Sequence, residues 1–521
     1  MPVHNWCHGG SRAHQYRADR SAVLDVTATG VSAHASGPEQ RAPLNGLSDI
    51  RAFFHTNKVP LYFISPTPFN LLGVDRWIRN FFYLTYFDSF EGTHSRVFVP
   101  RRRDRRDFDS MDEVCSHLLS DPETLDFIGG KGPGGKCCFV MMNEEIQSLA
   151  RSAGLEVMHP PIELRQRLGS KIVMTRLANE AGIPSVPNTI GRASNYDELL
   201  ALAQEAGLGD DLVISIAYGN AGSGTFFVHG QQDWDKSAGD MVGQELKVMK
   251  RIRNVEVCLE GAVTRHGTVV GPAMTSLVGY SELTPSRGSW CGNDIWHEVL
   301  PPAQTHAARE MVSKLGDVMR REGYLGYFEV DLLHDLDSDE LYLGEVNPRL
   351  SGASPMTNLT AEAYADMPLF LFHLLEYMGV DYELDIDEIN ARWERGYGED
   401  EVWGQVIITE TSPDLEIFTA TPRTGVWRID DDGRVSFSRT ANDWATLLDG
   451  SEAFYMRVAA PGDLRSEGAQ LGVLVTRSHL QTDDYQLSDR CQRWVKGMKA
   501  KFTSTPLSPA APIVSRLVAR A

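Results

Sequence analysis

The residues with the clearest capacity for chemistry lie in one segment, GYFEVDLLHDLDSDELYLGEVNPRLSG, at positions 326–352. Side chains alternate along a β-strand, so Glu329 and Asp331 share one face of a first predicted strand. By the same rule, Glu345 and Asn347 share one face of a second predicted strand. Three carboxylates and an amide would therefore line two neighbouring strands.

The polar link 335–340 predicts a tight turn that joins these strands into a hairpin. A turn centred on Ser338 places Asp331 opposite Glu345 if no bulge intervenes. Opposed carboxylates repel each other, so we expect a cation between them. Magnesium is commonly held by one or two carboxylates together with phosphate oxygens. The hairpin therefore predicts a magnesium–nucleotide site; the alternative is a solvated acidic hairpin.

Arg349 lies two residues beyond Asn347 in the same segment. A planar guanidinium at this point is suited to grip phosphate oxygens and to stabilise charge during phosphoryl transfer. The alternative is a salt bridge at the end of the hairpin.

A glycine-rich link, YGNAGSG, occupies 218–224 between two apolar runs that predict strands. Its glycines allow backbone N–H groups to approach phosphates closely, and Ser223 and Thr225 add hydroxyl donors. The link lacks the GK[ST] of a Walker loop, and no helix follows it as in a dinucleotide fingerprint. A plain turn is the alternative.

Lys171 begins a predicted helix over 171–182, in the run LGSK. A lysine at a helix start can reach phosphates as a point charge, although most such lysines lie on the surface.

The elements around these residues alternate between strands and helices. We predict strands at 59–65, 95–100, 136–142 and 155–160, and a helix at 143–154. This alternation indicates a parallel sheet flanked by helices in a mixed α/β, or α+β, fold. Beyond an acidic linker at 385–401, several short apolar runs predict a β-rich C-terminal region.

Length, charge and cysteine content argue against a nucleic-acid-binding, zinc-binding or membrane-spanning protein. A chain of 521 residues is long enough for three or four domains. Its formal net charge of -20 disfavours nucleic acid as a partner. The seven cysteines form no zinc pattern, and their odd, scattered set is typical of a reducing cytoplasm. We expect no membrane span and no signal peptide.

Taken in order, these segments resemble the ATP-grasp superfamily, most closely its biotin-carboxylase-like branch. The resemblance covers roughly residues 130–380, and LGEVNPRLSG at 343–352 is its most specific motif. It implies an N-terminal Rossmann-like pre-ATP-grasp domain, an ATP-grasp domain and a small C-terminal β-rich lobe. The expected limits are a flexible leader at 1–50, then 51–165, 166–385 with a mobile lid at about 190–255, 386–505, and a flexible tail at 506–521.

The resemblance also implies a role for each matching residue, with ATP and Mg²⁺ as cofactors. Arg349 would stabilise the transferred phosphoryl group, and Arg287 is a candidate for gripping an acyl phosphate. The magnesium ligands would be Asp331, Glu345 and Asn347. The residues that would bind ATP are Lys171, Tyr218, Gly219, Gly222, Ser223, Gly224 and Thr225, together with the hinge residues Lys250 and Ile252.

Two positions depart from the family pattern. The strand before the phosphate loop usually carries a second ATP lysine, and here Ser215 and Ile216 stand in its place. Met249 stands where the hinge usually has an acidic residue for the ribose. Nearby cations that could replace the lysine are Lys247, Lys250 and Arg251, and the sequence does not choose among them.

The function implied is an ATP-dependent ligase that joins a carboxylate to an amine through an acyl phosphate. Amino acids or peptides are the expected substrates, the expected location is the cytoplasm, and the resemblance leaves a homodimer open. Two alternatives remain: a carboxylase-like enzyme that activates bicarbonate, and a catalytically inactive nucleotide-binding protein.

Overall fold

The computed structural model describes residues 42–101, 108–219, 224–286, 288–364, 367–395 and 401–507, and the side chains of 361–364 are not described. Three residues of the expected site, Gly222, Ser223 and Arg287, lie outside the described residues. The same holds for most of the expected leader and most of the expected tail.

The N-terminal part of the chain forms a parallel sheet of five strands. In sheet order these are β4 (Val97–Phe98), β3 (Phe81–Thr85), β2 (Leu61–Ser65), β5 (Lys136–Cys138) and β6 (Glu156–Val157). Its helices are α1 (Gly46–His55), α2 (Met111–Ser120), α3 (Pro122–Gly130) and α4 (Glu144–Ser152). The alternation of strands and helices predicted for this region is confirmed.

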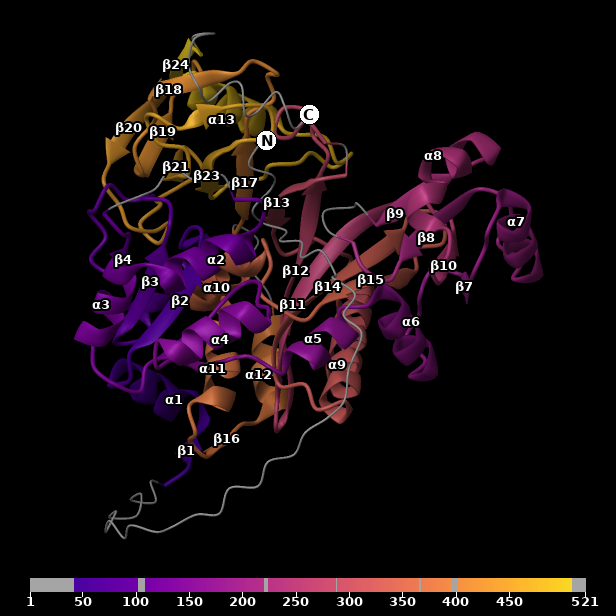
Figure 1. Ribbon diagram of the computed structural model, residues 1–521, viewed down its shortest axis with the longest axis horizontal. Helices are drawn as coiled ribbons and strands as arrows, with labels where there is room; N and C mark the ends of the chain where they lie inside the picture. Colours follow the sequence, from indigo (N-terminus) through magenta and orange to yellow (C-terminus); the bar gives the residue numbers. More distant parts are fainter. Residues whose placement is uncertain are drawn as a thin grey trace.

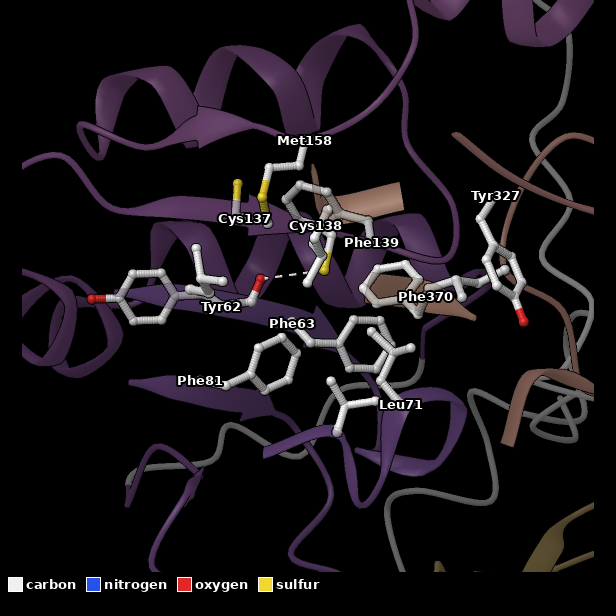
Figure 2. Packing of buried hydrophobic residues seen from close by; sticks show 14 of the residues in the cluster. Tyr62, Phe63, Leu71, Phe81, Cys137, Cys138, Phe139, Met158, Tyr327 and Phe370 are labelled. Carbon is white, nitrogen blue, oxygen red and sulfur yellow. Dashed lines mark hydrogen bonds between the residues drawn. The ribbon is translucent and has the colours of Figure 1, made fainter. Parts of the chain in front are cut away.

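The core of this sheet continues into the rest of the molecule. Figure 2 shows Phe63, Phe81 and Phe139 packed together, with Tyr327 and Phe370 beside them. Tyr327 belongs to strand β14 (Gly326–Asp335) and Phe370 to helix α11 (Phe370–Tyr377), so apolar burial joins the N-terminal sheet to the hairpin region.

The expected leader is too long at its C-terminal end. A short strand β1 (Leu44–Asn45) pairs with β16 (Tyr382–Glu383), and α1 begins at Gly46. The spacing of Leu47, Ile50 and Phe54 places these side chains on one buried face of α1. Apolar burial therefore fixes residues that the sequence interpretation assigned to a flexible segment.

A sheet of four strands forms a separate subdomain, which we call the lid (Figure 1, right). In sheet order its strands are β7 (Asn188–Gly191), β10 (Leu246–Lys250), β8 (Leu212–Ile216) and β9 (Thr225–Val228). Helices α7 (Tyr196–Glu205) and α8 (Gln231–Met241) supply side chains to its own apolar cluster, with members Ala193, Leu199, Ala203, Leu208, Leu212, Ile214, Val228, Trp234, Met241, Leu246 and Val248.

The largest sheet has ten strands. In order these are β15 (Leu341–Asn347), β14 (Gly326–Asp335), β11 (Asn254–Thr264), β12 (Gly267–Val278), β13 (Trp290–Ile295), β17 (Trp403–Thr409), β23 (Gln470–Thr476), β21 (Glu452–Arg457), β19 (Gly425–Ile429) and β20 (Val435–Arg439). Helix α9 (Pro302–Arg321) packs against β11 and β12. The remaining helices of this part are α5 (Ile162–Leu168), α6 (Lys171–Glu180), α10 (Ser354–Tyr364), α11 (Phe370–Tyr377) and α12 (Ile386–Glu394).

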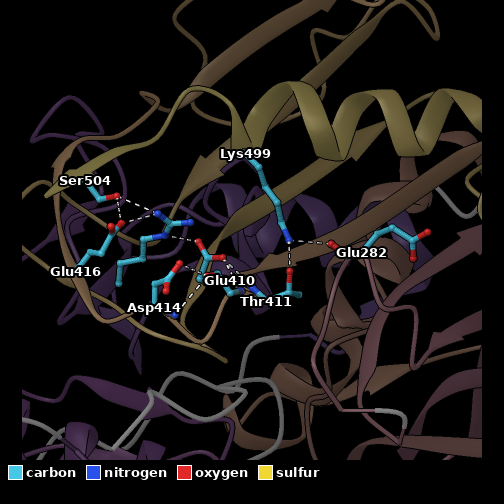
Figure 3. A network of polar contacts seen from close by, with 9 residues as sticks. Glu282, Glu410, Thr411, Asp414, Glu416, Lys499 and Ser504 are labelled. Atoms are coloured by element: carbon cyan, nitrogen blue, oxygen red, sulfur yellow. Dashed lines mark hydrogen bonds and ion pairs between the residues drawn. The ribbon is translucent and has the colours of Figure 1, made fainter. Parts of the chain in front are cut away.

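The C-terminal region is rich in strands, as predicted, but most of them extend the ten-stranded sheet through the pairing of β13 with β17. A smaller sheet contains β22 (Leu464–Arg465), β18 (Glu416–Ala420) and β24 (Thr503–Pro506), next to α13 (Asp489–Lys499). Arg465 bonds Glu410 and Glu416 there, and the ammonium group of Lys499 donates to Glu282 O (Figure 3). These contacts lie away from the acidic hairpin and fasten the C-terminal segment.

No described helix combines the length and the apolar character that crossing a bilayer requires.

Candidate nucleotide and metal site

The acidic hairpin forms as the sequence predicts, with a detail that the prediction missed. Asp331 in β14 lies opposite Glu345 in β15, and Glu329 lies opposite Asn347. A register shift separates Asp331 from Leu332, so the assumption of an unbulged hairpin is wrong. The bulge falls between the turn and the acidic pairs, and the predicted pairing is therefore preserved.

The two faces of β14 differ sharply in chemistry. Phe328, Val330 and Leu332 point into the apolar cluster that α9 covers. The alternating residues Glu329 and Asp331 lie on the opposite face. We call this face, with Glu345 and Asn347 of β15, the acidic floor.

A further carboxylate joins the acidic floor from β11. Burial, together with neighbouring carboxylates, raises the pKa of Asp331, Glu329 and Glu256. For Asp331 the neighbours are Glu329, Glu256 and Glu345. A carboxylate whose pKa is raised in this way is costly to ionise, and a bound divalent cation would remove that cost.

Asn347 and Arg349 are joined by a hydrogen bond at the end of the acidic floor. The amide nitrogen of Asn347 donates to Glu329 at 2.6 Å and to Glu345 at 3.3 Å. The guanidinium of Arg349 donates to the amide oxygen of Asn347 at 2.8 Å. The following loop is fixed by Glu260, which accepts from the hydroxyl of Ser354 at 2.7 Å. The predicted phosphoryl-stabilising arginine therefore lies beside the predicted metal ligands.

Lys171 links the acidic floor to the lid. Its ammonium nitrogen lies 2.6 Å from Glu345 Oε2 and donates to the hydroxyl of Thr225 at 3.4 Å. Helix α6 begins at Lys171, where Ser170 caps it and the backbone N–H of Lys171 donates to Ala217 O at 2.9 Å. The structure thus brings together three residues that the sequence predicted separately.

The two strands that flank the glycine-rich link approach each other closely at Gly219 and Gly224, and we call this point the glycine neck. A Cβ at Gly219 would lie 2.5 Å from the backbone of Gly224, a distance that no side chain can occupy. Glycine is therefore required where the two strands meet. Tyr218, beside this neck, is 56% exposed.

The face of the lid opposite its apolar cluster carries polar groups. Ser215 pairs with Thr225 on one side and with Lys247 on the other. Lys247 is 1% exposed, and burial, together with the charge of Lys171, lowers its pKa to about 8 against the opposing effect of Glu345. Of the three cations considered as replacements for the missing lysine, Lys247 is the one that faces the acidic floor.

The predicted hinge follows β10. The backbone N–H of Lys250 donates to Pro187 O at 3.0 Å, so this donor is already used. The Lys250 side chain is exposed, and Ile252 is half-buried in the segment that leads to β11. Met249, which stands at the position expected to face the ribose, is 8% exposed.

Sequence reasoning did not mention Glu256, gave Glu329 a place on the acidic face but no role, and named Lys247 only as one of three possible cations. The period of two along β14 was enough to assign Glu329 to the floor. Glu256 and Lys247 reach the site through the register of β11 and β10 with their neighbours, which no local pattern reveals.

The donor set suits magnesium and a nucleotide. Carboxylate oxygens on adjacent strands are hard ligands, and cations from α6 and the lid oppose them. Among the described residues, no three histidine, cysteine or acidic side chains already surround a single point. The fit therefore rests on one or two carboxylates with phosphate oxygens completing the coordination, which is the usual magnesium arrangement.

No family model matches the sequence. The biotin carboxylase domain of the 2-oxoglutarate carboxylase from Hydrogenobacter thermophilus, a dimer in complex with MgADP, ADP and bicarbonate, superposes with a TM-score of 0.56. It is 11% identical, and the match covers 86% of this chain and 91% of that one. The chain has an ATP-grasp fold of the biotin-carboxylase type. The resemblance to this superfamily and branch is thus confirmed at the level of the fold.

Two further proteins show the breadth of this ATP-grasp likeness. N5-carboxyaminoimidazole synthase from Aspergillus clavatus, in complex with ADP and 5-aminoimidazole ribonucleotide, has a TM-score of 0.50 and 11% identity over 81% of this chain and 94% of that one. The mitochondrial methylcrotonoyl-CoA carboxylase subunit alpha of Arabidopsis thaliana is 23% identical over 233 residues, which are 42% of this chain and 30% of that protein. The chain thus spans less than a third of that relative's length.

Proposed function

We propose that this protein is an ATP-dependent carboxylate–amine ligase that forms an amide or peptide bond and releases ADP and phosphate. The observation that carries the proposal is the acidic pair Asp331–Glu345, which lies beneath a lid and is reached by the ammonium group of Lys171. Such a site is suited to hold a magnesium-bound triphosphate.

Each group in the site has a distinct proposed task. Asp331 and Glu345 would hold Mg²⁺ with Asn347 beside them, and Lys171 would exchange part of its contact with Glu345 for phosphate oxygens. Magnesium, when bound, neutralises charge on the phosphates. The solved neighbours in complex with MgADP, and with ADP and a ribonucleotide, support these assignments.

The proposed reaction has two steps. A substrate carboxylate oxygen attacks the terminal phosphorus of ATP, the bond to ADP breaks, and an acyl phosphate forms. The nitrogen of a neutral amine then attacks the acyl carbon, phosphate leaves with the bonding electrons, and the nitrogen loses a proton. Arg349 lies where its guanidinium would stabilise the transferred phosphoryl group.

Water must be kept from the acyl phosphate between the two steps. The lid is suited to this task because it has an apolar cluster of its own, so it could move against the main body without disturbing the main core. Arg287, which the sequence suggested as a grip for the acyl phosphate, lies outside the described residues.

A second function is supported by the comparisons, because the matched relatives include carboxylases and one solved neighbour contains bicarbonate. In this alternative the activated carboxylate is bicarbonate, and carboxyphosphate replaces the acyl phosphate. The cytoplasmic location, the homodimer and the amino-acid or peptide substrates of the first proposal stay predictions.

An ADP-release screen tests both proposals together. A matrix of amino acids, short peptides and small carboxylates is paired with amines, and parallel wells contain bicarbonate with and without biotin. ADP release that requires both a carboxylate and an amine, with the amide detected by mass spectrometry, supports the ligase. Release with bicarbonate alone, or with biotin, supports the carboxylase, and no release in any well contradicts both.

A further inference from the structure

We propose that Lys247 binds the polyphosphate of the nucleotide, as a second cation beside Lys171, from strand β10 and not from the strand that leads into the glycine link. This inference rests on the proposed function only for the presence of a nucleotide; it does not depend on which carboxylate or amine is used.

The position of Lys247 follows from strand register. Lys247 pairs directly with Ser215, and Ser215 pairs directly with Thr225, so the three side chains form one row across the lid. Directly opposed residues in an antiparallel pair share a face. Thr225 contacts Lys171, so the row faces the acidic floor.

The opposite face of the same strands confirms this orientation. Leu246 and Val248, the neighbours of Lys247 in the chain, both belong to the apolar cluster of the lid. Because side chains alternate, Lys247 must point away from that cluster. Helices α7 and α8 therefore lie behind the lid, and Lys247 lies in front of it.

The ammonium group of Lys247 is buried without a counter-charge in contact. The residue is 1% exposed, and within the described part of the chain no side-chain hydrogen bond or ion pair engages its nitrogen. A buried ammonium without a partner is costly, and proteins rarely keep one unless an anion binds beside it.

The neighbouring charges indicate which anion this is. Glu345 raises the pKa of Lys247 but bonds Lys171 at 2.6 Å, while burial and Lys171 itself lower that pKa. The Glu345 carboxylate contacts Lys171 and acts on Lys247 only at longer range, so an added polyanion would relieve the repulsion between the two ammonium groups. A triphosphate held over magnesium on the floor has the required charge and length.

A structural alternative makes a different prediction. If Lys247 only balances the carboxylates of the floor, its removal would lower the stability of the protein and would change the binding of every ligand alike. If it grips phosphates, its removal would weaken ATP and ADP but leave adenosine unaffected.

Equilibrium binding of MgATP, MgADP and adenosine to the full chain separates these roles. We expect Lys247→Met to weaken MgATP and MgADP at least about tenfold, the loss expected for one charged hydrogen bond, while adenosine binding stays within about twofold. Lys236→Met is the matched control, because that lysine lies exposed on α8 behind the lid. Equal weakening of all three ligands, or no weakening, would overturn the inference.

A lysine swap keeps the test decisive even if Lys247→Met does not fold. The double variant Ser215→Lys, Lys247→Ser moves the ammonium group to the adjacent strand, about 5 Å away in the same row. We expect it to recover most of the MgATP affinity, whereas a purely local role for position 247 predicts no recovery. Wild-type MgATP binding without any amide product would contradict the ligase but leave the role of Lys247 intact.

Discussion

The acidic floor and the lid are two halves of one candidate site, and they are built in different ways. The floor strand β14 lies between β11 and β15 within the ten-stranded sheet, and its apolar face joins a cluster that α9 covers. The lid is a separate four-stranded sheet with an apolar cluster of its own. The floor is thus part of the main body, and we expect the lid to respond to a ligand without disturbing the main core.

This difference indicates a division of work. In the proposed mechanism, a rigid floor would preorganise the metal ligands, and the lid would bring cations to the phosphates and exclude water. The following predictions test that division, beginning with the change of largest expected effect.

Glu345→Gln tests the floor directly. The amide retains the shape of the side chain but removes the charge that would hold magnesium, so we expect ATP turnover to fall about 10²–10³-fold. The measurement is ADP release with the substrate pair found in the screen. Glu340→Gln, near the exposed turn of the same hairpin, is the control and should keep full turnover.

Leucine truncation compares the two cores. Leu332→Ala in the cluster beneath the floor should lower the free energy of unfolding of the main body by about 2–5 kcal/mol. Leu199→Ala in the lid cluster should loosen the lid by a similar amount, yet leave the main unfolding transition nearly unchanged. Hydrogen exchange of lid amides, measured beside urea unfolding, separates the two; a shared loss in both variants would contradict the independence of the lid.

The folding stability that depends on His373, a residue bonded to the start of β14, should decrease in acid. Burial lowers the pKa of His373 to about 3, and its imidazole accepts from Tyr327 N and bonds Met158 O. Because the folded pKa lies below the unfolded value, protonation favours unfolding. The stability is complete above pH 6.5 and is lost as the pH falls toward 3.

Between pH 7 and pH 5 this linkage amounts to about 2 kcal/mol for His373. Urea unfolding at the two pH values measures it, and His373→Gln, which keeps a donor and an acceptor but does not titrate, should show a smaller pH dependence. An equal dependence in the variant would assign the acid sensitivity to other groups.

The glycine neck should give the smallest change. A methyl group at Gly219 meets the backbone of Gly224, so Gly219→Ala should push apart the ends of β8 and β9, shift Thr225 relative to Lys171 and lower turnover about tenfold. Gly230→Ala introduces a methyl group that meets nothing within 4 Å and should leave turnover unchanged. Equal turnover in both variants would show that the neck has no part in catalysis.

The contrast between floor and lid also explains what the sequence could predict. Asp331, Glu345 and Asn347 lie within one hairpin, so alternation and a turn were enough to pair them. The bulge was missed because its extra residue, Gly344 of β15, gives no signal of its own in the sequence. It places Leu341 and Leu343 in the same apolar cluster as Val346, on the side opposite Glu345 and Asn347.

Lys247 could not be assigned in advance, because its place depends on the register between β10 and β8. Helix α8 and strand β9 separate these strands in the sequence. Alternation with Leu246 and Val248 fixes the face of Lys247, but only the register places it opposite Ser215. Helix α1 was missed for another reason. Its buried face contains few residues, and the polar composition before it resembled a continuous flexible segment.

The most direct test of the account is the binding of ATP to the full chain with and without Mg²⁺, measured by calorimetry for the wild type and Asp331→Asn. The account predicts tight binding that requires the metal in the wild type, and binding in the variant that is weak and insensitive to the metal. Equal ATP affinity with Mg²⁺ and with EDTA in the wild type would contradict the magnesium–nucleotide site on which the proposed ligase depends.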